Sequence, residues 1–304
     1  MKDDILSNVY YRAQENIWNG KEILSQLLKK NNDTLLLRKD SSGADDRAKS
    51  FLKIIDLLID GERAAWNVSA DLTNVVDDVS AKLALTSQAH DESRHATTLI
   101  LYKEKFVADN ASLEFIESNP HSIRLLTEIS KADSIEKKLL GIHLMIEPVA
   151  IVIFKSLKEN NIEPVLTELL PYFEADEGRH IVIGINYLPP LIKEMSHPEK
   201  LDLLFWQLRM LFFEVQALKE LEKDFEALGF TSEQVFRLAE KKQLEVLNML
   251  ADELGISQKI WEPIRKAVEL YKNHLFRGED INYLNLATTT IYSKINQLLY
   301  PNNE

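Results

Sequence analysis

The sequence predicts an all-α fold, a four-helix bundle with additional helices at both ends. Two copies of one pentapeptide, Asp-Glu-x-Arg-His, end at His95 and His180, and a glutamate precedes each copy at the same distance. The 304 residues include only 9 glycines and 9 prolines, and 45% are hydrophobic, which fits long helices joined by few turns. No window shows the sustained alternation of apolar and polar residues that is typical of a strand.

The first predicted element is one amphipathic helix over residues 3–30. Its apolar residues recur on one face from Ile5 to Leu27. A polar loop at about 39–46 follows and leads into the helix that carries Glu62.

The four bundle helices follow from the spacing of the glutamates. The interval from Glu62 to Glu92 is the same as the interval from Glu147 to Glu177. From the middle of a helix, about 14 residues reach the turn and a similar number return to the same height, so this spacing suits an antiparallel hairpin. The segment 95–147 is longer because it crosses over between hairpins. The sequence therefore predicts two hairpins related as an internal repeat.

Prolines and an apolar run organise the rest of the chain. Asn119-Pro120 and Pro189-Pro190 are expected to break later helices. The run Leu203–Phe213 opens another strongly apolar helix. We expect two domains: a bundle with its N-terminal helix over 1–198, and a helical extension over 199–304 that covers the bundle or forms a homodimer interface.

The repeated motif carries the chemistry. Glu and His three residues apart share one face of a helix, so each pentapeptide presents a carboxylate and an imidazole to the same point. With the two single glutamates, the set has four carboxylates and two histidines. Such a set is typical of a carboxylate-bridged two-metal centre inside a four-helix bundle. The candidate metal ligands are Glu62, Glu92, His95, Glu147, Glu177 and His180.

The surroundings of the single glutamates support burial. Glu62 and Glu147 each lie within an apolar run, where an unpaired carboxylate would be costly. A metal ion is an effective partner for a buried carboxylate, so we infer that both glutamates coordinate metal.

The other charged residues of the pentapeptides predict a supporting layer. A metal-bound imidazole usually donates its second N–H to a carboxylate. Asp91 and Asp176 are each expected to accept this bond from the histidine of the opposite pentapeptide, and Arg94 and Arg179 to neutralise them. The alternative is a set of surface salt bridges on two unrelated helices.

A third Glu-x-x-His serves as a control. Glu194 and His197 have the same spacing, but they lack the flanking Asp and Arg, and Pro198 follows directly. We expect this pair at a helix end and outside any metal site.

Apolar residues on the same faces as the ligands predict either a substrate pocket or ordinary bundle core. They are Ala65, Trp66, Leu99, Ile151, Phe154, Phe173 and Ile181.

Several single residues near the motifs leave alternatives open. Pro148 is expected to free the carbonyl of Leu144 and to bend its helix. His143 is an extra ligand, a proton relay or a satisfied core histidine. Tyr102 and Tyr187 each follow a motif histidine by seven residues, and they either relay electrons or pack against a neighbouring hairpin.

The two motifs and their preceding glutamates resemble the ferritin-like di-iron carboxylate superfamily, over roughly residues 45–195. The doubled pentapeptide and Gly61–Ala65 are most similar to the large hydroxylase subunits of bacterial multicomponent monooxygenases, and the acyl carrier protein desaturases are also similar. The resemblance implies that one iron is bound by Glu62, Glu92 and His95 and the other by Glu147, Glu177 and His180. It also implies that Glu92 and Glu177 bridge the two irons.

The chain departs from these similar families at four positions. The hydroxylases carry a threonine where this chain has Ile151, and the desaturases carry one at Ala150. Small subunits of ribonucleotide reductase place a radical tyrosine at the position of Leu99. Aminoarene N-oxygenases have an added histidine at the position of Phe173. The superfamily is therefore better indicated than the subfamily.

The composition excludes several classes of function. The chain has no cysteine, so it holds neither disulfides nor thiolate-bound iron–sulfur clusters. It lacks a Gly-rich dinucleotide motif, so electrons would come from a separate donor protein. A net charge of −12 argues against nucleic acid as a partner. No run of about 18 uncharged apolar residues predicts a membrane span, and the N-terminus has no secretory pattern. We expect a cytoplasmic protein.

The leading functional hypothesis is an oxidoreductase that uses two iron ions, or manganese and iron, to activate molecular oxygen and oxidise a small hydrophobic or aromatic substrate. One alternative is a radical-generating subunit, with Tyr102, Tyr187 or Trp66 as the redox-active residue. Another is iron storage or detoxification.

Overall fold

The computed structural model of the protein describes residues 4–37, 44–110 and 119–237, with a few isolated positions beyond. The chain divides into two compact units, Met1–Leu244 and Glu245–Glu304. The candidate site residues all belong to the first unit.

The described residues form helices and contain no strand, which confirms the predicted all-α class. The elements are α1 (Ile5–Glu15), α2 (Gly20–Lys30), α3 (Ala44–Val75), α4 (Val79–Asp109), α5 (Pro120–Ser130), α6 (Ile135–Gly141), the π-helical turn η1 (Ile142–Ile146), α7 (Glu147–Glu159), α8 (Pro164–Glu194), α9 (His197–Glu220) and α10 (Glu222–Ala227).

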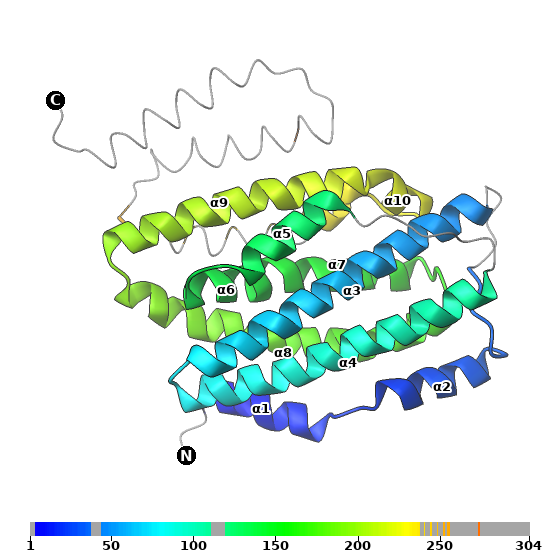
Figure 1. Ribbon diagram of the computed structural model, residues 1–304, viewed down its shortest axis with the longest axis horizontal. Coiled ribbons are helices and arrows are strands. Elements are labelled where there is room, and N and C mark those ends of the chain that lie inside the picture. Colours follow the sequence, from blue (N-terminus) through cyan, green and yellow to red (C-terminus); the bar gives the residue numbers. More distant parts are fainter. Residues whose placement is uncertain are drawn as a thin grey trace. The chain divides into compact units, whose positions relative to one another are not determined.

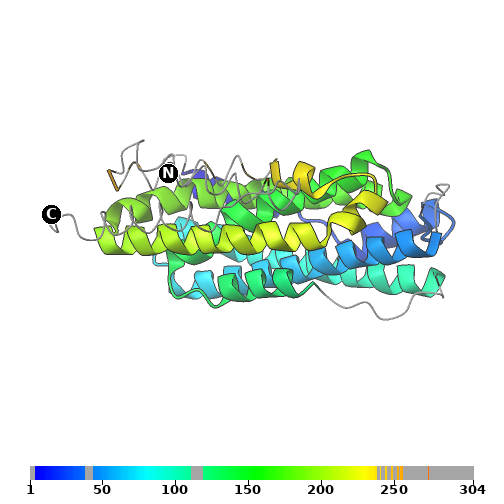
Figure 2. The ribbon, with the colours of Figure 1, turned by 90° about the horizontal axis from the view of Figure 1, so that it is seen from above.

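Four helical rods make the bundle (Figure 1). Helices α3 and α4 form one hairpin, and the continuous run α6–η1–α7 forms the other with α8. Helices α1 and α2 pack on α4 and α8, whereas α5 packs on α3 and α9, and α9 also packs on α6. Seen from above, the long helices follow nearly a common direction (Figure 2). The bundle is therefore covered by different helices on two sides.

Side-chain caps fix the start of several helices. Asp78 accepts from the N–H of Ala81 at 2.7 Å at the start of α4, and the Glu163 carboxylate accepts from the N–H of Leu166 at 2.8 Å at the start of α8. Asn119 caps α5 directly before Pro120, so the helix break expected there is confirmed.

The N-terminal prediction of one helix over residues 3–30 is wrong, because the chain leaves helical geometry at residues 16–19 and forms α1 and α2 instead. Asn19 caps α2 by accepting from the N–H of Glu22 at 3.1 Å. Gly20 then allows α2 to approach α4, since an added Cβ would lie 1.8 Å from Thr98 Oγ1.

The predicted loop at 39–46 falls mainly outside the described residues, which resume at Ala44, where α3 has already begun. The prediction that Pro189-Pro190 breaks a helix is wrong, because α8 continues to Glu194. Leu188 and Ile192 are fully buried, so packing holds this last turn in spite of the N–H groups that the prolines lack.

Part of the predicted C-terminal extension is described. Helices α9 and α10 belong to the same compact unit as the bundle, and α10 packs on α3. The division at residue 198 and the homodimer interface stay predictions.

One helical run, Ile135–Glu159, is long and apolar enough to cross a membrane by length and composition alone. Of the most apolar stretch of this run, 67% is buried inside the protein, as in the core helix of a bundle. Its apolar composition is therefore accounted for by packing.

Candidate metal centre

The six candidate ligands come together at mid-bundle from four rods. Glu62 comes from α3, Glu92 and His95 from α4, Glu147 from the first residue of α7, and Glu177 and His180 from α8. None of the six is more than 4% exposed. Equal sequence spacing in the two hairpins has thus brought both sets to one height.

Each histidine directs Nδ1 at carboxylates. His95 Nδ1 lies 3.2 Å from Glu62 Oε2 and 3.2 Å from Glu177 Oε1. His180 Nδ1 lies 2.9 Å from Glu92 Oε1 and 3.0 Å from Glu177 Oε2. Nδ1 is therefore the nitrogen of each ring that is available to a metal ion.

These groups divide into two overlapping sets. Glu62, Glu92, His95 and Glu177 offer ligand atoms that all lie within 4.8 Å of one another, and so do Glu92, Glu147, Glu177 and His180. Glu92 and Glu177 belong to both sets. The geometry can hold two ions that share two carboxylates.

The second nitrogen of each ring faces the aspartate of the opposite motif. His95 Nε2 lies 3.0 Å from Asp176 Oδ2, and His180 Nε2 lies 3.4 Å from Asp91 Oδ2. This crossed arrangement fixes both imidazoles with Nδ1 facing inward.

The two arginines close a ring of charges around the aspartates. Arg94 donates to Asp91 at 2.5 Å and to Asp176 at 2.8 Å. Arg179 donates to Asp176 at 2.5 Å and to Asp91 at 3.1 Å. Both aspartates are 1–2% exposed, so these contacts are not the surface salt bridges of the alternative interpretation.

The crowding of carboxylates perturbs their protonation. Burial raises the pKa of Glu62 and of Glu147 well above the usual range, and the negative charge of Glu177 raises both further. Burial alone would lower the pKa values of His95 and His180, but the surrounding carboxylates outweigh it and raise both well above the usual value. Without cations, the site therefore retains protons.

Two buried oxygens show that the donor set suits a metal. Glu92 Oε2 and Glu147 Oε2 have no hydrogen-bond partner within the described part of the chain. A buried carboxylate oxygen without a partner is costly, and coordination would satisfy both. The two arginines balance the two aspartates, so the four glutamates would be balanced by two divalent cations.

Gln88 is a site residue that the motif did not reveal. Its Nε2 donates to Glu147 Oε1 at 2.8 Å, and its Oε1 lies 2.7 Å from His143 Nε2. His143 Nδ1 lies 3.1 Å from the carbonyl of Leu139, and burial lowers the pKa of His143 to about 4. His143 thus contacts the site through Gln88 and lies outside the two groups of potential metal ligands, whereas the choice between a proton relay and a core histidine stays a prediction.

Trp18 is a second residue that the sequence did not reveal. Its Nε1 donates to Asp176 Oδ2 at 2.8 Å, and the same oxygen contacts His95. Its ring also lies under the guanidinium of Arg94, 4.7 Å from ring centre to Cζ. The break between α1 and α2 brings Trp18 to this place, and such a contact across 158 residues has no local sequence signal.

The π-helical turn η1 ends directly before Glu147. Its widened turn carries His143, and Pro148 follows Glu147 inside the first turn of α7. A π-helix, a feature that is frequent at functional sites, therefore directly precedes Glu147 and Pro148, and the bend expected at Pro148 stays a prediction.

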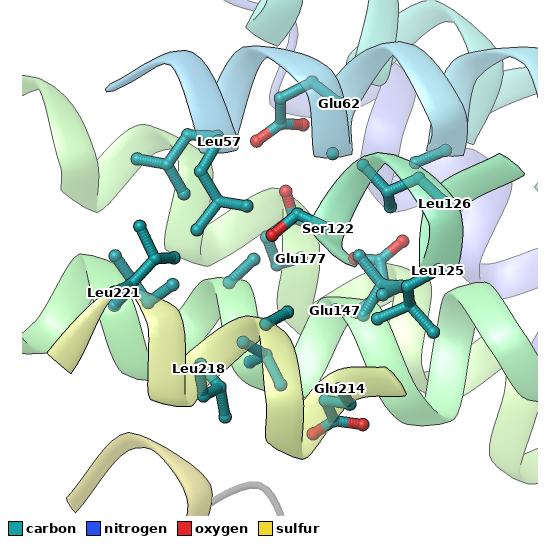
Figure 3. Close-up of a pocket in the computed structure, with 18 of the residues that line it drawn as sticks. Leu57, Glu62, Ser122, Leu125, Leu126, Glu147, Glu177, Glu214, Leu218 and Leu221 are labelled. Atoms are coloured by element: carbon teal, nitrogen blue, oxygen red, sulfur yellow. The ribbon is translucent and has the colours of Figure 1, made fainter. Parts of the chain in front are cut away.

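A cavity of about 70 Å³ adjoins the carboxylates on the side of α5 and α9. Figure 3 shows Glu62 reaching into it from α3, opposite Leu218 and Leu221 at the end of α9. Its lining is almost entirely apolar, apart from the four site glutamates, Glu214 and Ser122. The carboxylate face of the site is thus open to a small apolar molecule.

The residues predicted to line a pocket are mostly placed elsewhere. Ala65 lines the cavity. Leu99, Phe154 and Phe173 are fully buried core residues, and the ring of Phe173 stacks on His95 at 4.3 Å between centroids. Trp66 is 41% exposed. Ile151 and Ile181 are half-buried and do not line the cavity. The helices that cover the bundle decide where the cavity lies.

The predicted tyrosines pack rather than face the ligands. The Tyr102 hydroxyl donates to Glu163 Oε2 at 2.8 Å, and its ring packs on Phe51 and Phe106. Tyr187 is half-buried near the end of α8.

The control pair behaves as predicted. Helix α8 ends at Glu194 and α9 begins at His197, so the two residues lie at helix ends. Neither belongs to the groups of potential metal ligands in the described chain.

Comparison with known proteins supports the fold. No protein-family model matches the chain, and no curated protein matches it by sequence. Among solved structures, an R2-like ligand-binding oxidase with an aerobically reconstituted Mn/Fe cofactor matches with a TM-score of 0.62 and 17% identity, over 80% of this chain and 92% of that one. A point variant of an R2-like ligand-binding oxidase with an Fe/Fe cofactor matches with a TM-score of 0.62 and 16% identity, over 81% and 93%. The chain therefore has the all-α ferritin-like fold of these oxidases.

Proposed function

We propose that the protein is an oxygen-activating dimetal oxidase that acts on a small hydrophobic substrate. The observation that carries the proposal is the buried convergence of four carboxylates and two imidazoles in two overlapping sets. The similar solved oxidases, with Mn/Fe and Fe/Fe cofactors, support a cofactor of two first-row ions.

In this proposal each ion has its own histidine and terminal glutamate. Glu62 and His95 would hold one ion, Glu147 and His180 the other, and Glu92 and Glu177 would bridge them. Hard carboxylate oxygens suit iron and manganese, and two such ions would supply electrons for oxygen reduction. Asp91 and Asp176 would keep both rings oriented, with Arg94 and Arg179 compensating their charge.

In this proposal the residues around the ligands would exclude water and admit an apolar substrate. Phe173 and Trp18 cover the ring of His95, so the histidine side is closed by aromatic side chains. The apolar cavity adjoins the carboxylates on the opposite side. A substrate would therefore approach from the side of α5 and α9.

Metal content and oxygen use test the proposal directly. The purified chain, loaded anaerobically with ferrous iron, should hold about two ions per chain and consume oxygen. Metal analysis that finds no bound ion would overturn the proposal. Ions that are bound but never react with oxygen would leave only metal binding.

The narrower sequence predictions stay part of this proposal. The hydroxylase or desaturase type of reaction, the separate electron donor, the homodimer and the cytoplasmic location await experiment. The alternative of iron storage would require many more ions per chain than two.

One observation favours the radical-generating alternative. Trp18, rather than Tyr102, Tyr187 or Trp66, is hydrogen-bonded through Asp176 to His95. An indole in this position is suited to exchange an electron with the metal site, whereas the Tyr102 hydroxyl is engaged by Glu163.

Substitution of this indole separates the two functions. Trp18→Phe keeps the aromatic packing and removes the N–H donor. A radical subunit should lose most of its radical yield, measured by electron paramagnetic resonance, with metal content unchanged. An oxidase needs external electrons only to reduce its two metal ions between turnovers. Its reaction with oxygen in a single turnover should therefore be unchanged in Trp18→Phe.

A further inference from the structure

The apolar cavity meets a second, more polar cavity of about 360 Å³. The two share three lining residues, Leu57, Ser122 and Leu221. The second cavity is otherwise lined mainly by polar and charged groups, including Asp56, Asp60, Asp224, Glu220 and Lys53. Ser122 therefore lies where the apolar cavity adjoins the more polar one.

Ser122 has a buried hydroxyl at this junction. The residue is 6% exposed, and its Oγ has no hydrogen-bond partner within the described part of the chain. Its backbone N–H is held by Asn119 Oδ1 at 3.1 Å, which fixes it in the first turn of α5.

An unsatisfied buried hydroxyl in a lined cavity indicates a ligand group. A hydroxyl can donate one hydrogen bond and accept others, so it pairs with an alcohol or an amine. Lys53, the cation among the residues that line the second cavity, is paired with Asp224 at 3.2 Å, so it is not free to bind the carboxylate of a substrate.

We propose that Ser122 is a specificity-determining residue that holds the hydroxyl or amino group of an amphiphilic substrate, whose apolar body lies in the cavity beside the four glutamates. This inference rests on the proposed oxidase function and adds a substrate class and an orientation to it. The carbon nearest the glutamates would be remote from the polar group.

A pair of nearly isosteric probes tests the hydrogen bond. Binding of hexan-1-ol and of 1-fluorohexane would be measured by NMR titration on the full chain, loaded with ferrous iron and kept free of oxygen. Ser122→Ala should weaken hexan-1-ol binding about fivefold, the effect of one lost hydrogen bond, and leave 1-fluorohexane binding within twofold.

The chain offers a matched control for the substitution. Ser69 on α3 is also fully buried with a hydroxyl that lacks a partner in the described residues, but it does not line the cavity. Ser69→Ala should leave the binding of both probes unchanged. This control separates a lost contact from a general effect of removing a buried hydroxyl.

Two outcomes would overturn the inference: hexan-1-ol binding that is unchanged in Ser122→Ala, or equal losses for the two probes. Either result with two ions still bound would leave the proposed oxidase intact. A chain that binds no metal would instead overturn the oxidase proposal, whatever the alcohol does.

Discussion

The two hairpins of the bundle share a sequence motif but differ in how they present it. Helices α3 and α4 are uninterrupted over 32 and 31 residues, and they carry Glu62, Glu92 and His95 on regular turns. In the other hairpin the rod opposite α8 is divided into α6, η1 and α7, and Glu147 follows the π-helical turn. The two hairpins therefore differ in the rod that carries the single glutamate: α3 is a regular helix through Glu62, whereas a π-helical turn directly precedes Glu147.

The surroundings of the two ligand sets also differ. His95 is enclosed by aromatic rings, with Phe173 at 4.3 Å and Trp18 at 5.9 Å between centroids. In the other ligand set, Glu147 accepts a hydrogen bond from the side chain of Gln88, which in turn contacts His143. A repeat that would give two equivalent metal positions has thus diverged, and the two positions are expected to differ in affinity.

The largest effect expected concerns the glutamates shared by both ligand sets. Glu92→Ala should abolish binding of both ions, because Glu92 contributes to each set. Glu62→Ala removes a ligand from only one set, so it should lose one ion preferentially. Metal analysis of the purified variants checks this, with circular dichroism to establish folding. Loss of a single ion from Glu92→Ala would contradict the shared position.

The pH dependence of metal binding comes next in size. The carboxylates keep the pKa values of His95 and His180 above the usual 6.5 in spite of burial, so both rings hold protons at neutral pH without metal. Imidazole binds metal in its neutral form, so binding must displace these protons. Affinity should therefore rise with pH, roughly tenfold per pH unit for each proton displaced.

Manganese(II) titrations between about pH 6 and 8, followed by electron paramagnetic resonance, measure this slope without oxidation. His180→Ala should reduce the number of protons released. An affinity that does not change with pH would show that the rings are neutral before the metal arrives.

The third prediction compares the two aspartates. Replacing a carboxylate that orients a metal-bound histidine typically costs 10- to 100-fold in metal affinity. For Asp176→Asn the loss of metal affinity should be near the upper end of this range, because Asp176 lies 3.0 Å from His95 Nε2 and also accepts a hydrogen bond from Trp18. For Asp91→Asn the loss of metal affinity should be near the lower end, since Asp91 Oδ2 lies 3.4 Å from His180 Nε2. Equal losses would indicate that the two halves are equivalent after all.

The convergence of these side chains could be predicted because it depends on local periodicity. Glu and His three apart share a face in any helix, and an equal interval in two hairpins returns each chain segment to the same height. The crossed contacts of Asp91 and Asp176 follow from the same symmetry. The helix boundary expected at Asn119-Pro120 is also a local feature, since Asn119 caps α5 and Pro120 opens it.

What could not be predicted depends on contacts between distant parts of the chain. Trp18 reaches Asp176 only because the chain breaks between α1 and α2, and the cavity lies where α5 and α9 cover the bundle. Pro189-Pro190 would end a helix by itself, but burial of neighbouring side chains keeps α8 helical. The turn η1 likewise has no residue pattern apart from Pro148 to announce it.

The smallest of the four effects tests how η1 is accommodated. A Cβ at Gly184 on α8 would lie 2.5 Å from His143 Cβ and 3.2 Å from Leu144 Cδ2, both within η1. Gly184→Ala should therefore lower the free energy of unfolding by about 1–3 kcal/mol through overpacking. The displacement of His143 should also weaken metal binding slightly through Gln88.

Gly178 on the same helix is the matched control, because an added Cβ there meets nothing within 4 Å. Gly178→Ala should stabilise the protein by up to about 1 kcal/mol, since alanine restricts the unfolded chain and favours the helix. Urea denaturation of both variants measures the difference. If Gly184→Ala proved as stable as Gly178→Ala, η1 would be able to shift away from α8 at little cost. The irregular half would then owe its shape to the sequence around Pro148, and not to its close packing against α8.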